Sequence, residues 1–197
     1  MNKYIKRGFT LIELLIVMAI LGVLAVVVLV AINPVQQLAR TRDTGRKSAV
    51  TQVGHALQGY YTGRNGRFLV TATCPAVTAG GGPGAWMDCL QSVGELKSVP
   101  NAINYSAGPN PCTSNPLASE LGAVQNNLCY KVSANGGQSI VYVSMESNSE
   151  AAKCPSTNPI PWFVWSSADG RSGLVCTANI TTEPGSGSQS GQPGWNL

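Results

Sequence analysis

Residues 6–32 read KRGFTLIELLIVMAILGVLAVVVLVAI, and the rest of the architecture follows from this segment. From Leu14 to Ile32 it contains 19 consecutive residues without a charged or hydrogen-bonding side chain. As a helix this run is about 28 Å long, which is close to the roughly 30 Å hydrocarbon core of a bilayer. The sequence therefore predicts one helix that crosses a membrane.

The charges on either side of the apolar run bear on its orientation. Lys3, Lys6 and Arg7 precede it without an acidic residue, so the amino terminus is predicted to be cytoplasmic and residues 35–197 to lie outside. A second basic group beyond the run, tempered only by Asp43, opposes this orientation: Arg40, Arg42, Arg46 and Lys47. The orientation therefore depends on the short leader.

One carboxylate, that of Glu13, lies at the start of the apolar segment. A charge near the membrane interior costs on the order of 3 kcal/mol, so an unpaired carboxylate is seldom kept there. A cleavable secretory signal would have a shorter apolar core and small residues ahead of its cleavage point. A plain single-span anchor explains the length of the run but neither Glu13 nor the abrupt Gly8-Phe9 junction. Glu13 is therefore predicted to pair with a cation.

The junction between the leader and the helix resembles the class III signal of type IV prepilins and of the pseudopilins of type II secretion. The resemblance rests on residues 6–15, KRGFTLIELL, in which a glycine, an aromatic residue and a glutamate four residues later precede a full-length apolar helix. It implies that a membrane-embedded prepilin peptidase cuts between Gly8 and Phe9 on the cytoplasmic side and methylates the amino group of Phe9. Residues 1–8 are then a leader peptide, and the helix stays in the product.

Cleavage of this kind creates a new cation, the amino group of Phe9. In a helical stack of parallel copies, this amino group is predicted to pair with Glu13 of a neighbour. Pairing a buried carboxylate is much better than leaving it alone, but desolvation keeps the net gain modest, so the pair is expected to set the register first. Thr10 is either a supporting hydroxyl at this site or an ordinary satisfied polar residue.

Asn33-Pro34 ends the apolar run and predicts a kink or a short unwound section, because proline removes a backbone donor and clashes with the preceding turn. Residues 9–34 are accordingly assigned to the transmembrane and filament-core helix. Apolar residues then recur at spacings of three and four, so residues 35–62 are predicted to be an amphipathic half whose later part packs on a globular domain. The single histidine, His55, is interpreted as a surface residue rather than a ligand.

Residues 63–183 are predicted to form the extracytoplasmic globular domain. Its first half is rich in turns, with short helices expected at 86–97 and 117–124. From residue 128 the apolar period changes to two, and two hairpins give a small antiparallel sheet of about four strands. The predicted class is α+β, with the long helix packed on this sheet and disulfides in the loops. Residues 184–197, rich in Gly, Ser, Gln and Pro, are predicted to be a flexible tail unless they dock in an assembly.

The six cysteines lie outside the apolar helix, and none is closer than 15 residues to the next. This spacing disfavours a zinc knuckle and a C-x-x-C redox centre. An even set in an extracytoplasmic domain indicates disulfides rather than free buried thiols, each contributing roughly 3 kcal/mol in the chain-entropy model. Of the 15 connectivities, we predict the sequential one: Cys74 with Cys89, Cys112 with Cys129, and Cys154 with Cys176.

The sequence gives no sign of an enzyme. It has no G-x-S-x-G elbow and no H-E-x-x-H pair, and Gly80–Gly84 lacks the Lys-Ser/Thr ending of a phosphate loop. No cofactor and no metal are predicted. Some pseudopilins carry calcium, for which Asp169, Glu146 and Glu150 are the candidates here, but we interpret them as solvated turn charges. The 13 Lys and Arg against 9 Asp and Glu, three of the basic ones in the leader, do not indicate a dedicated nucleic-acid binder.

The sequence thus predicts a structural subunit of a type IV pilus that is stored in the membrane and polymerises into an extracellular helical filament. The resemblance implies three partners besides further copies of the chain: the prepilin peptidase, an assembly ATPase and a membrane platform protein. One alternative is a type II secretion pseudopilin of the same build. A second is a membrane-anchored extracellular binding domain that never polymerises.

Overall fold

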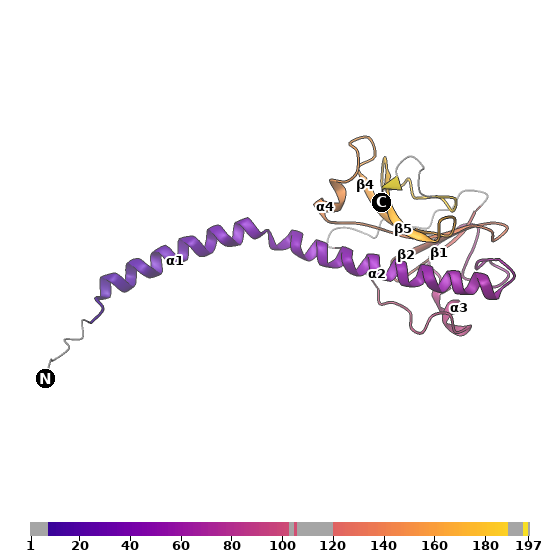
Figure 1. The fold of residues 1–197 in the computed structure, drawn as a ribbon, viewed down its shortest axis with the longest axis horizontal. Helices are drawn as coiled ribbons and strands as arrows, with labels where there is room; N and C mark the ends of the chain where they lie inside the picture. Colours follow the sequence, from indigo (N-terminus) through magenta and orange to yellow (C-terminus); the bar gives the residue numbers. More distant parts are fainter. Residues whose placement is uncertain (1–7, 103–104, 106–119, 189–194, 197) are drawn as a thin grey trace. The chain divides into compact units, whose positions relative to one another are not determined.

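The computed structural model describes residues 8–102, 105, 120–188 and 195–196. The chain divides into two compact units, residues 1–38 and 39–197, which are treated separately below. The first unit holds helix α1 (Leu11–Ile32) and the start of helix α2 (Pro34–Gly63) (Figure 1). The second unit holds the rest of α2 and every strand.

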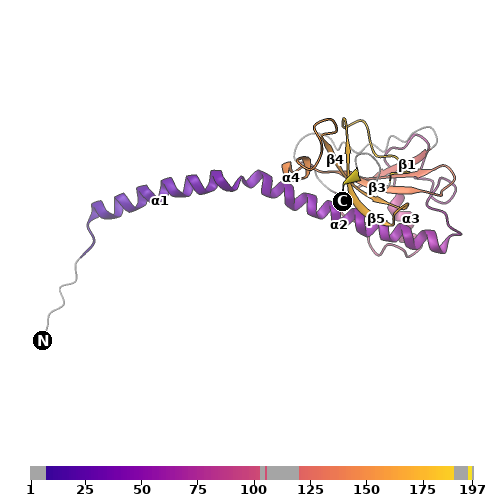
Figure 2. The same ribbon diagram turned by 45° about the horizontal axis from the view of Figure 1, so that its top comes forward.

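The break between the two helices lies at one residue, Asn33. This residue adopts the left-handed conformation, with φ 44° and ψ 76°, and ends α1, and Pro34 then begins α2. Asparagine tolerates the left-handed region at a helix end, and proline suits the first position of a helix because the amide hydrogen it lacks would have no helical partner there. The ribbon is interrupted at this place in both views (Figures 1 and 2). The kink or unwound section that the sequence predicts is therefore a one-residue interruption.

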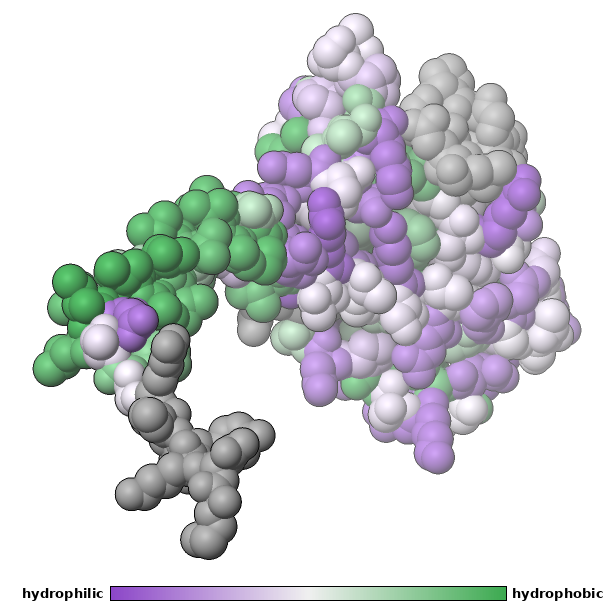
Figure 3. All heavy atoms as spheres, turned by 60° about the vertical axis from the view of Figure 1, so that its left-hand side comes forward, coloured by the Kyte–Doolittle hydropathy of each residue, from purple (hydrophilic) through white to green (hydrophobic). Residues whose placement is uncertain are grey.

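Helix α1 buries none of its residues in the single chain. Its side chains are apolar on all sides, and the visible face is almost uniformly hydrophobic (Figure 3). Within the described residues, one helical stretch is long and apolar enough to span a membrane, and its apolar part is α1. A helix that is hydrophobic all round needs lipid or other protein around it.

In the second unit, α2 packs one stripe of side chains into the core. Val50, Val53, Leu57 and Tyr60, spaced by three and four residues, are all at most 3% exposed. His55 lies on the exposed side of the same helix. The predicted amphipathic helix is confirmed, because this spacing places the apolar residues on one face of a 3.6-residue period.

The sheet is antiparallel, and its strands follow one another in chain order. The predicted α+β class is confirmed. The four predicted strands correspond to β2 to β5, and the structure adds β1 and the short β6 at the two edges. The strands are β1 (Glu120–Gln125), β2 (Leu128–Ser133), β3 (Ser139–Ser144), β4 (Ile160–Ser166), β5 (Arg171–Thr177) and β6 (Trp195–Asn196).

The helix predicted at 117–124 is wrong. Residues 117–119 lie outside the described part of the chain, and from Glu120 onward the segment is strand β1, which pairs with β2 from Glu120 opposite Ser133 to Gln125 opposite Leu128. Asn126 and Asn127, with φ of 52° and 65°, join the two strands. Two consecutive residues with positive φ make the turn that fits the twist of a hairpin. Pairing with β2 therefore overrides the local preference of Glu120, Leu121 and Ala123 for a helix.

The other predicted short helix is present but shorter than expected. Helix α3 covers Trp86–Ser92 rather than 86–97, and Gly94, with φ 84°, follows its end. A glycine in the left-handed region just after the last turn is a common helix stop. A further short helix, α4 (Asn148–Ala151), connects β3 to β4.

The two faces of the sheet have different coverings. The face toward α2 carries Tyr130, Val141 and Trp165, all in the main core. Trp165 lies so close to α2 that a Cβ atom at Gly54 would be 2.2 Å from its Cγ, so only glycine fits there. The opposite face has its own buried cluster, which includes Tyr142 and Trp162.

The segment that leads into the predicted flexible tail is packed on this opposite face. The Glu183 carboxylate lies 3.2 Å from Lys131 Nζ and accepts a hydrogen bond of 2.6 Å from the Tyr142 hydroxyl. Lys131 also donates to the Pro184 carbonyl, and the amide of Ser186 donates to Glu120. Residues 184–188, which the sequence assigns to a flexible tail, therefore contact the sheet through Pro184 and Ser186, next to the ion pair of Lys131 with Glu183. Residues 189–194 and 197 lie outside the described residues.

Two of the three predicted cysteine pairs are at bonding distance in the structure. Cys74 and Cys89 are 2.08 Å apart at sulfur, and Cys154 and Cys176 are 1.96 Å apart. Cys129 is also disulfide-bonded, but its predicted partner, Cys112, lies outside the described residues. The first bridge ties the loop before α3 to that helix, and the second ties the turn after α4 to β5.

Candidate processing and assembly site

The residues just ahead of α1 form a short exposed segment. Gly8, Phe9 and Thr10 are not helical, and Phe9 is 83% exposed. Thr10 is extended, with φ −82° and ψ 151°, and is the residue that caps the helix. The predicted cleavage junction, Gly8-Phe9, is thus outside the helix, and its cleavage stays a prediction.

Thr10 and Glu13 form a reciprocal capping box at the start of α1. The Glu13 carboxylate accepts hydrogen bonds of 2.8 Å from both the backbone amide and the hydroxyl of Thr10. The Glu13 amide in turn donates to the Thr10 hydroxyl over 3.3 Å. This arrangement satisfies amide groups that otherwise have no partner in the first turn of a helix.

The capping box gives Thr10 a definite role and gives Glu13 local donors. Thr10 contacts Glu13 directly within the chain. Both alternatives for Thr10 fit this contact, and its role in assembly stays a prediction. The two Thr10 donors reduce the free-energy cost of placing the Glu13 carboxylate near the membrane, but neither donor carries a positive charge. The predicted pairing of Glu13 with the Phe9 amino group of another copy involves a second chain and stays a prediction.

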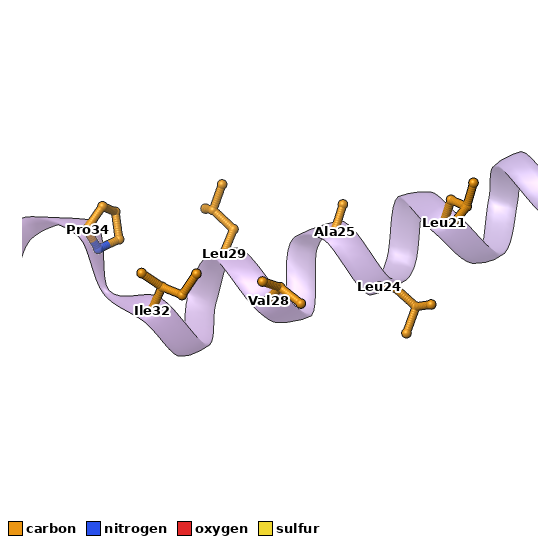
Figure 4. A pocket seen from close by; sticks show the side chains of 7 residues that line it. All are labelled: Leu21, Leu24, Ala25, Val28, Leu29, Ile32 and Pro34. Carbon is orange, nitrogen blue, oxygen red and sulfur yellow. The ribbon is translucent and has the colours of Figure 1, made fainter.

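A shallow apolar groove of about 600 Å³ follows α1 toward its end. Figure 4 shows the side chains that line it, which come from successive turns of the helix and from the residue after the break. They are Leu21, Leu24, Ala25, Val28, Leu29, Ile32 and Pro34. Spacings of three and four residues put the helical members on one stripe, and the small Ala25 within it leaves room for a neighbouring helix.

The basic residues that follow the apolar helix are paired within the second unit. Arg42 and Arg46 each lie 2.9 Å from a different oxygen of Glu146, and Lys47 Nζ lies 2.7 Å from Glu150. These two glutamates are thus not solvated turn charges, which corrects the sequence interpretation. They lie more than 100 residues away along the chain, so no local pattern indicates the pairing.

Arg46 is the centre of this ion-pair cluster and is fully buried. Its guanidinium also lies 2.7 Å from Asp43 and 4.0 Å from the centre of the Tyr105 ring. Asp43 accepts amide hydrogen bonds from Glu146 and Ser147, so it holds the loop after β3 against α2. A buried arginine requires such partners, because an unpaired buried charge is strongly destabilising.

Glu150 is the carboxylate that Lys47 and Lys153 share. Burial alone would raise its pKa, but hydrogen bonds from Lys47 and Lys153 outweigh that effect and hold the pKa below the usual 4.5. In the described residues no group of three His, Cys, Asp or Glu side chains is arranged to hold a metal ion. Two of the three calcium candidates, Glu146 and Glu150, serve as counter-ions for α2 instead.

Comparison with known proteins bears on the first unit alone. Residues 4–29 match the family described as the prokaryotic N-terminal methylation motif. No curated protein and no solved structure matches the chain. The matched range contains the Gly8-Phe9 junction, the capping box and most of the apolar helix. The chain therefore carries the class III prepilin signal that type IV pilins and pseudopilins share.

Proposed function

We propose that the chain is a structural subunit of a type IV pilus. The observation that carries the proposal is the form of α1: a membrane-length helix that buries nothing in the single chain and begins at a capped carboxylate within a matched methylation motif. The apolar surface of such a helix needs lipid or other helices around it. The α+β unit that follows has its own core and disulfides, as expected of a domain exposed on the surface of a filament.

Processing is the first step of the proposed function. The prepilin peptidase cuts the bond between Gly8 and Phe9 and methylates the new amino group. The bond is accessible in the structure, because both residues are exposed and precede the helix. Cleavage removes the basic leader and leaves the apolar helix as the amino-terminal part of the mature subunit.

Assembly then adds a charged partner to Glu13. In the stored subunit its carboxylate accepts two hydrogen bonds from Thr10. In the filament the charged amino group of Phe9 on a neighbour joins it, while the stripe from Leu21 to Ile32 packs against other copies of α1. The Thr10 hydrogen bonds leave the negative charge of Glu13 uncompensated, whereas the amino group neutralises it, and opposite charges attract each other more strongly in a dry filament core than in water. An assembly ATPase and a membrane platform protein drive this step.

The same architecture serves a type II secretion pseudopilin, since the matched motif belongs to both. The two functions differ in the length and location of the polymer. Electron microscopy of cells with an antibody against the α+β unit separates long surface fibres from a short element confined to the envelope. A diffuse membrane signal without any polymer would support neither function and would favour a membrane-anchored binding domain.

The test of the assembly role compares three variants in the native host. Glu13→Ala and Glu13→Gln are expected to insert into the membrane but to form few or no filaments, while Thr10→Ser, which keeps the capping hydroxyl, forms them normally. Normal filament number and length in Glu13→Gln would refute the role of the charge.

Gly8→Val is expected to leave a full-length precursor, because a β-branched side chain crowds the cleavage junction. Mass spectrometry of the purified chain shows whether it begins at Met1 or at Phe9.

A further inference from the structure

The turn that follows β5 presents an exposed triplet, Asn179-Ile180-Thr181. It fits the pattern Asn-x-Ser/Thr, with a residue other than proline in the middle, that accepts N-linked saccharides on exported proteins. All three residues are exposed, and Ile180 is 43% exposed, which is unusual for a large apolar side chain in this unit. A three-residue pattern recurs often by composition, so its geometry decides whether it is a usable acceptor.

The hydroxyl of the triplet already contacts the acceptor amide. Thr181 donates to Asn179 Oδ1 through its hydroxyl over 2.7 Å and through its backbone amide over 3.1 Å. Thr182 adds two further donors to the same oxygen, both at 2.8 Å. The Asn179 side-chain nitrogen, in contrast, has no hydrogen bond to any described residue and is exposed. The amide oxygen is thus fixed and the amide nitrogen is available.

The turn is held firmly to the sheet on its other side. The Thr177 hydroxyl donates to the Asn179 carbonyl over 3.0 Å and accepts a 2.8 Å hydrogen bond from the buried indole nitrogen of Trp162. The Cys154–Cys176 bridge lies directly before these residues. A saccharide at Asn179 would therefore project from an ordered site without disturbing the core.

We infer that Asn179 is an N-glycosylation site of the mature subunit. The donor is a saccharide joined to a lipid through a phosphate or diphosphate, and the transfer is made by a membrane enzyme on the outer side. The Asn179 side-chain nitrogen attacks the anomeric carbon, a carbon–nitrogen bond forms, and the carbon–oxygen bond to the phosphate breaks. The phosphate leaves with the electron pair, and the amide proton passes to a base of the transferring enzyme.

The four donors on Asn179 Oδ1 favour this chemistry. An amide nitrogen is a weak nucleophile because its lone pair is delocalised onto the oxygen. Hydrogen bonds to that oxygen stabilise the negative charge that collects there as the nitrogen loses its proton, as donors do at an oxyanion. The inference rests on the proposed function in one respect, that the second unit lies outside the membrane.

The sequence contains one other triplet of this kind, Asn104-Tyr105-Ser106. Asn104 and Ser106 lie outside the described residues, so the structure gives no account of an acceptor there. Tyr105 itself is half-buried, with its ring against the guanidinium of Arg46. The assignment therefore concerns Asn179 alone.

The test measures the mass of the full mature chain purified from its native host, with peptide mapping across residues 171–188. The wild-type chain should carry an added saccharide mass on Asn179. Asn179→Gln and Thr181→Val should lose all of it, and Thr181→Ser should keep it. Thr182→Val is the matched control: it removes a hydroxyl that bonds the same oxygen but lies outside the triplet, so it should keep the modification.

An unmodified Asn179 in the native chain would overturn the inference, as would a saccharide found on Asn104 or on a serine or threonine instead. A saccharide mass that remains in Asn179→Gln would also contradict it, because the attachment would then lie at another residue. The same spectra show the amino terminus, so a chain that starts at Phe9 without a saccharide refutes this inference and leaves the proposed function intact.

Discussion

Helices α1 and α2 are joined through one residue, yet their apolar side chains differ in how far the single chain buries them. Helix α1 has an apolar surface on all sides and buries none of it, whereas α2 buries a stripe that includes Val50, Val53 and Leu57 in a core made by its own chain. The difference shows that the single chain provides packing partners for the apolar side chains of α2 but not for those of α1. The α2 interactions determine the stability of the folded unit, and those of α1 are left for the membrane or for other copies.

The charged residues of the two helices show the same contrast. In α1 the carboxylate of Glu13 has neutral donors from Thr10 and no cation within the described residues. In α2, Arg42, Arg46 and Lys47 have carboxylate partners from distant loops. Folding thus neutralises most of the basic group that opposes the predicted membrane orientation. We predict that the cation for Glu13 comes from another chain.

The largest expected effect is on the contact of α2 with the sheet. Gly54→Ala puts a methyl group where only 2.2 Å separates it from the Trp165 ring, and should lower the free energy of unfolding by about 3 kcal/mol. Gly45→Ala is the matched control: nothing lies within 4 Å of its Cβ position, and it should raise stability by up to about 1 kcal/mol, the difference in helix propensity. Thermal unfolding of the full chain in detergent, followed by tryptophan fluorescence, measures both. Equal effects would mean that the two glycines have similar surroundings.

The next effect concerns the buried arginine. Glu146→Gln removes the carboxylate that Arg42 and Arg46 share, and should cost about 2 kcal/mol because Arg46 keeps only Asp43 as a charged partner among the described residues. The loop after β3 should also become more open to proteolysis. Limited digestion and the same unfolding assay test this. A change below about 0.5 kcal/mol would show that the cluster adds little to the attachment of α2.

A smaller and pH-dependent effect is expected at Glu150. Its pKa in the folded chain lies below 4.5, so as the pH falls the unfolded chain binds this proton first. The stabilisation is therefore complete above pH 4.5 and disappears as the pH drops through the lower folded-state pKa. Solvent screening limits it to less than about 1 kcal/mol. The stability difference between wild type and Glu150→Gln should be constant from pH 7 to 5 and shrink below pH 4.5; a difference that grows on acidification would contradict this account.

The smallest effect on folding is expected in α1. Leu24→Ala should change the unfolding of the α+β unit by less than about 0.5 kcal/mol, because Leu24 is 55% exposed and belongs to the other unit. The same substitution should weaken filaments, since Leu24 lines the apolar groove of α1. Unfolding and mechanical shearing of filaments give the two measurements. A marked loss of folding stability would mean that α1 contributes to the fold of the single chain.

Much of the fold follows from local patterns in the sequence. The length of the apolar run predicts α1, the three-and-four spacing predicts the buried face of α2, and the period of two predicts β2 to β5. Asn33-Pro34 marks the break because both residues restrict the backbone in a known way. These features depend on neighbours within a few residues, so one chain contains the information.

The features that sequence analysis missed depend on partners far along the chain. Strand β1 has a composition suited to a helix and becomes a strand only because β2 pairs with it. Glu146 and Glu150 look like turn charges until α2 brings three basic residues beside them. Residues 184–188 look flexible until the contacts of Pro184 with Lys131 and of Ser186 with Glu120 are known. At the candidate site the key residues were all predicted from the motif, but the hydrogen bonds between Thr10 and Glu13 needed the structure.

The most direct test of the central claim is a cross-linking measurement at the start of α1. Filaments from native-host cells would be cross-linked with a zero-length carboxyl-to-amine reagent and digested, and the amino terminus located by mass spectrometry. Because N-methylation leaves a secondary amine that can still react, the account predicts a product that joins Phe9 of one copy to Glu13 of another and is absent from the few filaments that Glu13→Gln forms. Filaments whose subunits begin at Met1, or that form normally without this product, would contradict it.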